Sequence, residues 1–224
     1  MSTLSESPSP QAALLAQYLR RLRLPMMLRE YPALSEAAAR ERLPYERILV
    51  LLAEREVAAR DEYLVRQRLG QAKFPVLKDL DRFVFTETTV DEGQVRELAT
   101  GSFLDAKRNA IFIGGTGTGK THLCIGVASA VIRSRARGRF FNLVDLVNQL
   151  EHEKAAGRSG RLAETLLRYD VIVIDELGYL PFSQPGGQLL FHLISKLYEN
   201  TSLLITTNLT FADWPQVFGD STLS

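Results

Sequence analysis

The first third of the chain carries hydrophobic residues at helical spacing and contains no segment that favours a strand. A first helix is predicted by four such residues: Leu14, Leu15, Tyr18 and Leu22. Pro25 can open a second helix at its first position. Pro32 should kink or break that second helix near Tyr31, because proline lacks the N–H that a helix interior needs.

A third and longer helix is predicted to start near Pro44. It carries six hydrophobic residues: Ile48, Leu49, Leu51, Leu52, Val57 and Leu64. Its polar face is rich in Arg and Glu, with opposite charges four positions apart, as in Glu56 and Arg60. The three helices predict a small all-helical domain at residues 11–70, after a disordered Ser/Pro-rich tail at residues 1–10. Such a domain is too short to hold a large core by itself.

The remainder alternates apolar strands with helices. Strands are predicted at residues 110–113, from Phe140 onward, at 171–176 and at 203–208. Helices are predicted at residues 90–98, 122–132 and 143–154. The four β-branched residues at 171–174 are typical of a strand buried on both faces of a parallel sheet. Residues 90–224 therefore predict an α/β core, a parallel sheet flanked by helices, joined to the helical domain by a linker at residues 71–89.

A glycine-rich segment joins the first strand to the helix after it. It fits the phosphate-binding pattern G-x-x-x-x-G-K-[ST] at every fixed position and consists of Gly114, Gly115, Thr116, Gly117, Thr118, Gly119, Lys120 and Thr121. Glycines let backbone N–H groups turn toward a phosphate, and the helix N-terminus adds partial positive charge. Lys120 is expected to reach the β- and γ-phosphates, and the Thr121 hydroxyl to bind Mg²⁺. A chance match is disfavoured because strand and helix flank the segment as the chemistry requires.

Polar residues follow the next two buried strands. Ligands of open α/β sheets bind at the carboxyl ends of strands, so Asp175 is expected near Mg²⁺. Glu176 can polarise an attacking water, and the Asn208 amide can hold that water or sense the γ-phosphate. The alternatives are an acidic helix cap and a turn-forming asparagine. Two interpretations of the linker remain open. It can be a plain connector, or Phe83, Val84 or Phe85 can form an apolar wall over the nucleotide base.

Composition narrows the class of protein. The 224 residues are 46% hydrophobic and 24% charged, which is ordinary for a globular protein. No run approaches 18 apolar residues and no signal peptide is evident, so we expect a cytoplasmic protein without a membrane partner. Cys124 is the only cysteine and is expected to fill the core. The three histidines lack metal-ligand spacing, so nucleotide-bound Mg²⁺ is the one metal expected.

The net charge of +1 does not by itself indicate a nucleic-acid binder. The first 70 residues have no basic residue other than Arg, and their helical surface is equally compatible with salt bridges and with phosphate contacts. Four arginines at residues 133–139 favour a solvated helix end, with contacts to DNA phosphates or to a neighbouring subunit as the alternatives. The flexible loop at residues 155–161, with Arg158 and Arg161, suits a non-specific contact with a nucleic-acid backbone.

Together these segments resemble the AAA+ ATPases of the IstB/DnaC-like family, from about Tyr18 to the end of the chain. The most specific matches are residues 119–123, 175–181 and 207–208, and Trp214 with residues 217–220. The runs Asp-Glu-Leu-Gly-Tyr-Leu-Pro and Trp…Phe-Gly-Asp, and the early residues 18–25, are more similar to the IstB-type transposition helpers than to the helicase loaders.

The resemblance implies roles for the site residues. Lys120 and Thr121 match the Walker A lysine and Mg²⁺ ligand, with His122 beside them in the nucleotide-binding set. Asp175 and Glu176 match the Walker B pair, and Asn208 matches sensor 1. The family further implies a homo-oligomer with ATP sites between subunits, which binds DNA largely without sequence specificity and recruits a transposase.

The sequence departs from the family at its C-terminal end. Family members continue into a Leu-Asp-Arg-Leu run that provides an arginine finger, then a last strand and sensor 2, where this chain has residues 221–224. We therefore expect a core without its C-terminal part, ATP binding with weak or absent hydrolysis, and an exposed apolar edge at residues 110–113. A DnaC-like replicative helicase loader and a catalytically silent DNA-binding scaffold remain alternatives. A small-molecule P-loop kinase is disfavoured because it would leave Asn208 without a role.

Overall fold

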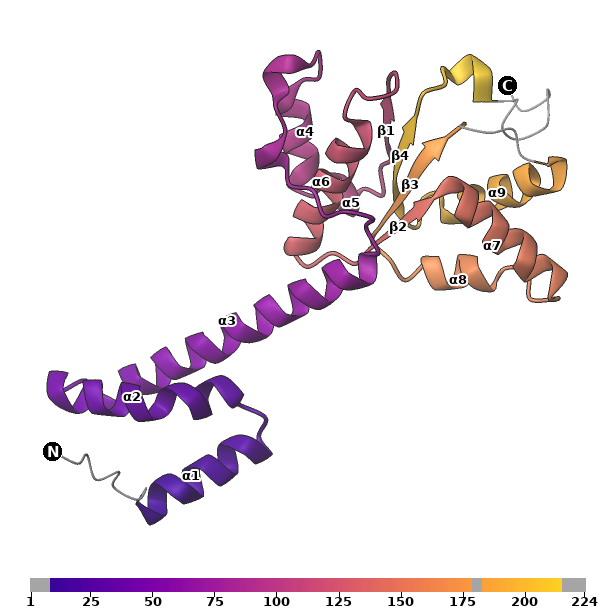
Figure 1. The fold of residues 1–224 in the computed structure, drawn as a ribbon. Coiled ribbons are helices and arrows are strands. Elements are labelled where there is room, and N and C mark those ends of the chain that lie inside the picture. Colours follow the sequence, from indigo (N-terminus) through magenta and orange to yellow (C-terminus); the bar gives the residue numbers. More distant parts are fainter. Residues whose placement is uncertain (1–8, 179–182, 215–224) are drawn as a thin grey trace, which may run out of the picture. The chain divides into compact units, whose positions relative to one another are not determined.

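The computed structural model describes residues 9–178 and 183–214. It contains two compact units, one within Met1–Leu64 and the other within Val65–Ser224 (Figure 1). The boundary falls inside a single long helix, α3 (Tyr45–Ala72). Within the described part of the chain, no helix has both the length and the hydrophobicity needed to span a bilayer.

The first unit consists of α1 (Pro10–Arg21), α2 (Pro25–Glu41) and the amino-terminal part of α3. Its buried apolar core is small and includes Leu19, Leu34, Ala38 and Leu52. The prediction that Pro32 kinks or breaks the second helix is wrong as to a break, because α2 runs through it. Proline's φ suits a helix, so its cost is one missing N–H donor and crowding of the preceding turn, and a kink at Pro32 stays a prediction.

A buried carboxylate on α3 holds the start of α2. The residue before α2, Leu24, offers no side-chain cap. Instead Glu56, only 4% exposed, accepts hydrogen bonds from the backbone N–H of Met26 at 2.9 Å and of Met27 at 3.2 Å. Arg60 pairs with Glu56 at 3.1 Å. A negative charge at this position satisfies two free N–H groups and complements the helix dipole.

The second unit is built on a parallel four-stranded sheet of order β1-β4-β3-β2. Its strands are β1 (Ala110–Ile113), β2 (Gly138–Asn142), β3 (Val171–Leu177) and β4 (Ser202–Thr207). One face carries α4 (Glu92–Ala99), α5 (Ser102–Asp105) and α6 (Lys120–Arg133) (Figure 1). The other carries α7 (Leu143–Ala155), α8 (Arg161–Leu166) and α9 (Gln184–Leu197). The predicted α/β class and helical amino-terminal region are thus confirmed.

The two faces are filled by alternating residues of the strands. Along β3, Val171 and Val173 pack with α6, whereas Ile172 and Ile174 pack with the α7 and α9 side. Because successive side chains of a strand point to opposite faces, an unbroken β-branched run serves both cores. Cys124 on α6 is fully buried, and burial, followed by the negative charge of Asp175, raises the pKa of its thiol well above the ordinary value. This placement fits a core residue.

Short 3-10 turns lie outside the sheet: η1 (Leu80–Arg82), η2 (Phe85–Glu87) and η3 (Phe211–Asp213). Leu80 of η1 is buried against α6, where a Cβ on Gly126 would come within 2.6 Å of its Cδ2. The segment after α3 is therefore packed onto the sheet unit at Leu80. Helices α8 and α9 were not anticipated from the sequence, and residues 179–182 and 215–224, with their family-specific matches, lie outside the described residues.

An ion pair joins the amino ends of β2 and β3. Asp170 accepts hydrogen bonds from the Arg137 backbone N–H at 2.7 Å, from Nε at 3.2 Å and from Nη2 at 3.0 Å. Burial by itself raises the pKa of Asp170, but the hydrogen bonds and charge of Arg137, with the charge of Lys107, outweigh it. The pKa of this carboxyl therefore lies below its ordinary value.

We predict that Glu56→Ala lowers the free energy of unfolding by about 2 kcal/mol, because two N–H groups lose a charged acceptor. Urea denaturation measures the loss, and hydrogen exchange should accelerate at the amides of Met26 and Met27. Glu54→Ala, at an exposed position two residues away on the same helix, is the matched control. Equal effects of the two substitutions would show that Glu56 does not cap α2.

A second prediction concerns acid stability. Because the folded-state pKa of Asp170 is lowered, its contribution is complete above the unfolded-state value of about 3.9 and is lost as pH falls through the folded-state pKa. Asp170→Asn should therefore be less stable than the parent near neutral pH, by at most about 1 kcal/mol for a partly exposed pair. Thermal melts should show this gap closing below about pH 4. A gap that widens in acid would refute the assignment.

Candidate nucleotide-binding site

The glycine-rich loop at residues 114–121 leaves the carboxyl end of β1 and enters α6. Gly117 and Gly119 have φ angles of 79° and 85°, which side-chain-bearing residues rarely adopt. A Cβ on Gly119 would also lie 2.6 Å from Cε2 of Phe83. The loop therefore requires glycine at this position for both its backbone conformation and its close packing.

Lys120 lies across the loop. Its Nζ donates a hydrogen bond to the carbonyl oxygen of Gly115 at 2.6 Å, and the Thr118 hydroxyl donates to the same oxygen at 2.9 Å. An ammonium group at the first turn of α6, beside a glycine-rich turn whose backbone N–H groups can bind an anion, matches the chemistry of phosphate binding.

Asp175 joins three elements of the sheet unit. The Thr121 hydroxyl on α6 lies 2.9 Å from Oδ1 and 3.2 Å from Oδ2 of Asp175. The Thr206 hydroxyl on β4 also donates to Oδ1. Asp175 itself is only 6% exposed. The hydroxyl and carboxylate oxygens are hard ligands of the kind that Mg²⁺ prefers, so Thr121 and Asp175 fit this ion.

Glu176 occupies a bulge where the pairing of β3 with β4 shifts register, and its φ is 68°. The Thr206 hydroxyl accepts a hydrogen bond from the backbone N–H of Glu176 at 2.9 Å. Asn142, the last residue of β2, donates from Nδ2 to Glu176 Oε2 at 2.6 Å. Glu176 is therefore held at the carboxyl edge of the sheet by two neighbouring strands, its backbone by β4 and its side chain by β2.

These residues surround one small cavity of about 130 Å³ at the carboxyl ends of β1, β3 and β4. Its lining consists of Thr116, Gly117, Lys120, Thr121, Glu176, Thr206, Thr207 and Asn208. Four residues proposed from three separate motifs thus lie together: Lys120 and Thr121 of the glycine-rich loop, Glu176 and Asn208. In the described residues, no three His, Cys, Asp or Glu side chains form a group able to hold a metal ion independently of a nucleotide.

The sequence profile described as "IstB-like ATP binding protein" matches residues 17–224. The chain belongs to this family. It is 34% identical to "Insertion sequence IS5376 putative ATP-binding protein" of Geobacillus stearothermophilus, over 93% of this chain and 83% of that protein. It is also 34% identical to "Insertion sequence IS21 putative ATP-binding protein" of Pseudomonas aeruginosa, over 92% and 78% respectively. The resemblance seen in the sequence is therefore confirmed.

Among solved structures, this IstB-like chain is similar to the DnaC helicase loader, with a TM-score of 0.50 and 28% identity. The match covers 57% of this chain and 77% of that one. The sheet unit is thus an AAA+ P-loop fold of an ATP-binding family. That the loop at residues 114–121 binds the phosphates stays a prediction.

His122, placed by resemblance in the nucleotide-binding set, faces the segment after α3 in this IstB-like chain. Its Nε2 lies 3.1 Å from the carbonyl oxygen of Asp79, and its ring packs edge-on against Phe83 at 5.2 Å. Phe83 in turn packs against Phe85 at 4.8 Å. The aromatic residues therefore lie beside the phosphate loop, while their contact with a nucleotide base stays a prediction.

A larger cavity of about 530 Å³ runs from the phosphate loop along β1. Lys120 and Thr118 lie at one end, and Val90, Val95 and Leu98 contribute apolar lining. Among the described residues β1 forms an edge of the sheet, and Ile113 is 45% exposed. The mixture of apolar walls and phosphate-loop residues is suited to a nucleoside next to its phosphates.

Two residues that support the site were not assigned a role from the sequence. Asn142 is opposite Asp175 in the register of β2 and β3, and Thr206 contacts both acids of the Walker B pair. The available signal was weak: each is a polar residue near the end of an apolar strand. Recognising them requires the strand order, because β2, β3 and β4 are adjacent only in the folded sheet.

Mg²⁺ is expected to increase the affinity for ATP. We predict that this increase is about tenfold smaller in Thr206→Val than in the parent protein, because Asp175 loses its orienting hydroxyl. Titration of a fluorescent ATP analogue with and without Mg²⁺ measures this gain. Thr207→Val is the matched control, since the Thr207 hydroxyl is also buried but bonds to the Leu177 carbonyl and the Leu209 N–H. Both variants should lose stability. A similar loss of the Mg²⁺ effect in both would contradict the role of Thr206.

Proposed function

We propose that this protein is an ATP-dependent switch that binds DNA largely without sequence specificity and assists a transposase in target selection and transposition. Its relatives are ATP-binding proteins of insertion sequences, which supports a role in transposition. The observation that carries the ATPase proposal is the convergence of Lys120, Thr121, Glu176 and Asn208 around one cavity.

The proposed chemistry follows from the positions of these side chains. Lys120 exchanges its bond to the Gly115 carbonyl for the β- and γ-phosphates, where a charge-assisted bond is stronger. Thr121 and Asp175 would hold Mg²⁺, which when bound neutralises charge on the phosphate oxygens. Asn208 donates its amide N–H toward the γ-phosphate or the attacking water.

Glu176 acts as the base that orients and polarises the attacking water. Its carboxylate accepts a hydrogen bond from Asn142, so the amide fixes one oxygen and leaves the other available. The left-handed backbone at Glu176 is a conformation that costs free energy for a residue other than glycine. Its presence at the edge of the cavity supports a functional rather than a packing role.

We further propose that the protein acts in the cytoplasm as a homo-oligomer, with ATP sites between subunits. In this proposal residues 11–70 form a helical domain, residues 71–89 a linker and residues 90–224 the AAA+ core, so the helical domain can contact DNA or the transposase while the core responds to ATP.

A second candidate is loading of a replicative helicase, which the similarity to the DnaC helicase loader favours. Immobilised protein should retain a transposase of a related insertion sequence if the first proposal holds, and a hexameric replicative helicase if the second holds. A third candidate is a catalytically silent DNA scaffold, for which affinity for random DNA would be the same with and without ATP.

We predict that Lys120→Ala weakens ATP binding by more than about tenfold, since it removes a charge-assisted bond worth about 1.5–3 kcal/mol. Glu176→Gln should keep ATP affinity near that of the parent while turnover falls at least about a hundredfold. Titration of a fluorescent ATP analogue and phosphate release with random-sequence DNA measure the two effects. Turnover that survives Glu176→Gln would remove Glu176 as the base, and turnover that survives Lys120→Ala would place hydrolysis elsewhere.

A further inference from the structure

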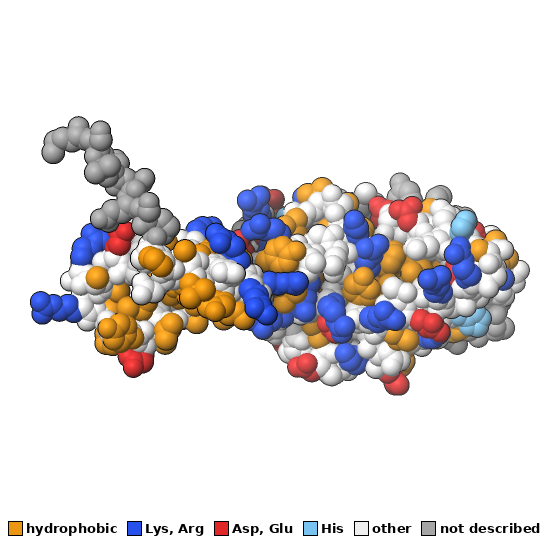
Figure 2. Space-filling view, turned by 90° about the horizontal axis from the view of Figure 1, so that it is seen from below, with side chains coloured by type: hydrophobic (Ala, Val, Ile, Leu, Met, Phe, Trp, Pro, Cys, Tyr) orange, Lys and Arg blue, Asp and Glu red, His pale blue; other side chains and the backbone are white. Residues whose placement is uncertain are grey.

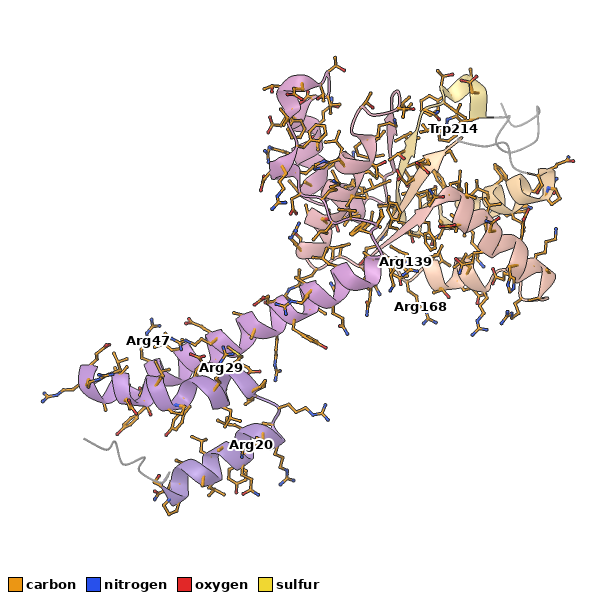
Figure 3. All side chains as sticks on the ribbon, viewed as in Figure 1. Arg20, Arg29, Arg47, Arg139, Arg168 and Trp214 are labelled. Atoms are coloured by element: carbon orange, nitrogen blue, oxygen red, sulfur yellow. The ribbon has the colours of Figure 1, made fainter. Side chains whose placement is uncertain are left out.

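A second polar cavity, of about 260 Å³, lies at the amino ends of β2 and β3 in the AAA+ unit. Three arginines line it, Arg68, Arg137 and Arg168, together with the polar side chains of Gln71, Thr165 and Tyr169. Figure 3 shows Arg139 and Arg168 at this lower edge of the unit. The ATP site occupies the opposite edge, where the same strands end.

The positive charge in this cavity is only partly balanced. Arg137 pairs with Asp170 at 3.0 Å. Arg68 has its Nη1 buried without any hydrogen-bond partner. Arg168 is exposed, and it forms no ion pair with a carboxylate of the described residues. Three guanidinium groups therefore face one carboxylate, and a buried donor without an acceptor is unfavourable unless a ligand supplies one.

The end of α3, which carries Arg68, is anchored on the sheet next to Arg137. Arg68 lies on the last turns of α3, which belong to the AAA+ unit. The guanidinium of Arg139 donates to the carbonyl oxygen of Gln71 at 2.9 Å and stacks over Phe141 at 5.3 Å. The end of α3 is thus anchored on β2, and the cavity does not need to be assembled by a ligand.

We propose that this cavity, the Arg68/Arg137/Arg168 pocket, binds a backbone phosphate of DNA. The inference rests on the proposed function, because it names one site through which the protein would contact DNA. Guanidinium groups present forks of N–H donors that match phosphate oxygens, and hydroxyl and amide side chains such as those of Thr165, Tyr169 and Gln71 are common further phosphate donors.

A phosphodiester backbone suits this edge better than a single carboxylate of a protein partner. Three arginines and the hydroxyl donors exceed the acceptor sites of one carboxylate. Positive charge also continues along the edge, where Lys107 lies close enough to lower the pKa of Asp170. Figure 2 shows many Lys and Arg side chains and fewer Asp and Glu side chains on the face seen from below. Such a surface fits a polyanion with regularly spaced charges.

The pocket can be tested without disturbing ATP binding. At about 3.3 Å per residue, the length of β3 between Asp170 and Asp175 separates the two sites by roughly 15 Å. Arg168 is exposed, so Arg168→Glu should not impair folding. Arg68→Gln removes the unpaired charge. The matched control is Arg82→Glu, an equal change of charge at an exposed arginine of η1, a turn that packs on α6 and does not line the pocket.

The experiment measures binding of the full chain to a random-sequence DNA duplex by fluorescence anisotropy, with ATP, over a range of salt concentrations. Arg168→Glu and Arg68→Gln should each weaken binding about tenfold at about 150 mM salt and lower the salt slope by about one, as expected for one lost phosphate contact. Arg82→Glu should change affinity less than about twofold, and affinity for a fluorescent ATP analogue should be unchanged in all three.

Three outcomes would overturn the proposal. If the parent protein binds DNA but both pocket variants keep its affinity and salt slope, the pocket is not a phosphate contact and the proposed function is unaffected. If the parent protein binds no DNA at any salt concentration, the proposed function fails and this inference with it. If the variants lose binding to poly-glutamate but keep binding to DNA, the pocket receives an acidic protein instead.

Discussion

The nucleotide site depends on one buried carboxylate. Asp175 accepts hydrogen bonds from Thr121 at the start of α6 and from Thr206 on β4, while it belongs to β3 itself. Burying a carboxylate is unfavourable unless its oxygens accept hydrogen bonds. The two hydroxyls supply these bonds, and they fix the positions of Thr121, Thr206 and Asp175 relative to one another. The result is that the phosphate loop, the acidic strand end and the adjacent strand are held in one arrangement, in which the cavity residues can act on the same phosphate.

The bulge at Glu176 is a consequence of the same arrangement. β3 pairs with β2 on one side and with β4 on the other, and its register with β4 shifts after Ile174. The shift allows the Thr206 hydroxyl to accept from the backbone N–H of Glu176 while it donates to Asp175. Two consecutive acids thus receive different environments. Asp175 is buried and accepts a hydrogen bond from Thr121 of α6. Glu176 is exposed at the cavity and accepts a hydrogen bond from Asn142.

Charged residues serve the fold as well as the surface. Of the arginines at residues 133–139, Arg133 pairs with Asp79, Arg137 with Asp170, and Arg139 with the backbone of Gln71. A sequence interpretation as a solvated helix end therefore understates their structural role. In the helical unit, Glu56 likewise stabilises a helix end far from it in sequence. Two arginines of the Arg68/Arg137/Arg168 pocket have no such partner among the described residues: Arg168, and Arg68 at its buried Nη1.

The sequence by itself determined the α/β class, the four strands and the phosphate loop, because these follow from local periodicity and from a motif whose glycines are required by the backbone. It also identified Lys120, Thr121, Asp175 and Glu176 as candidates through their positions beside predicted strands. Only the tertiary structure decided which side chains meet: the order β1-β4-β3-β2 places Asn142 and Thr206 beside the acids. The tertiary structure also decided that Glu56 of α3 caps the start of α2 and that the arginines gather at the amino ends of the strands. Contacts between distant segments leave no periodic pattern in the sequence.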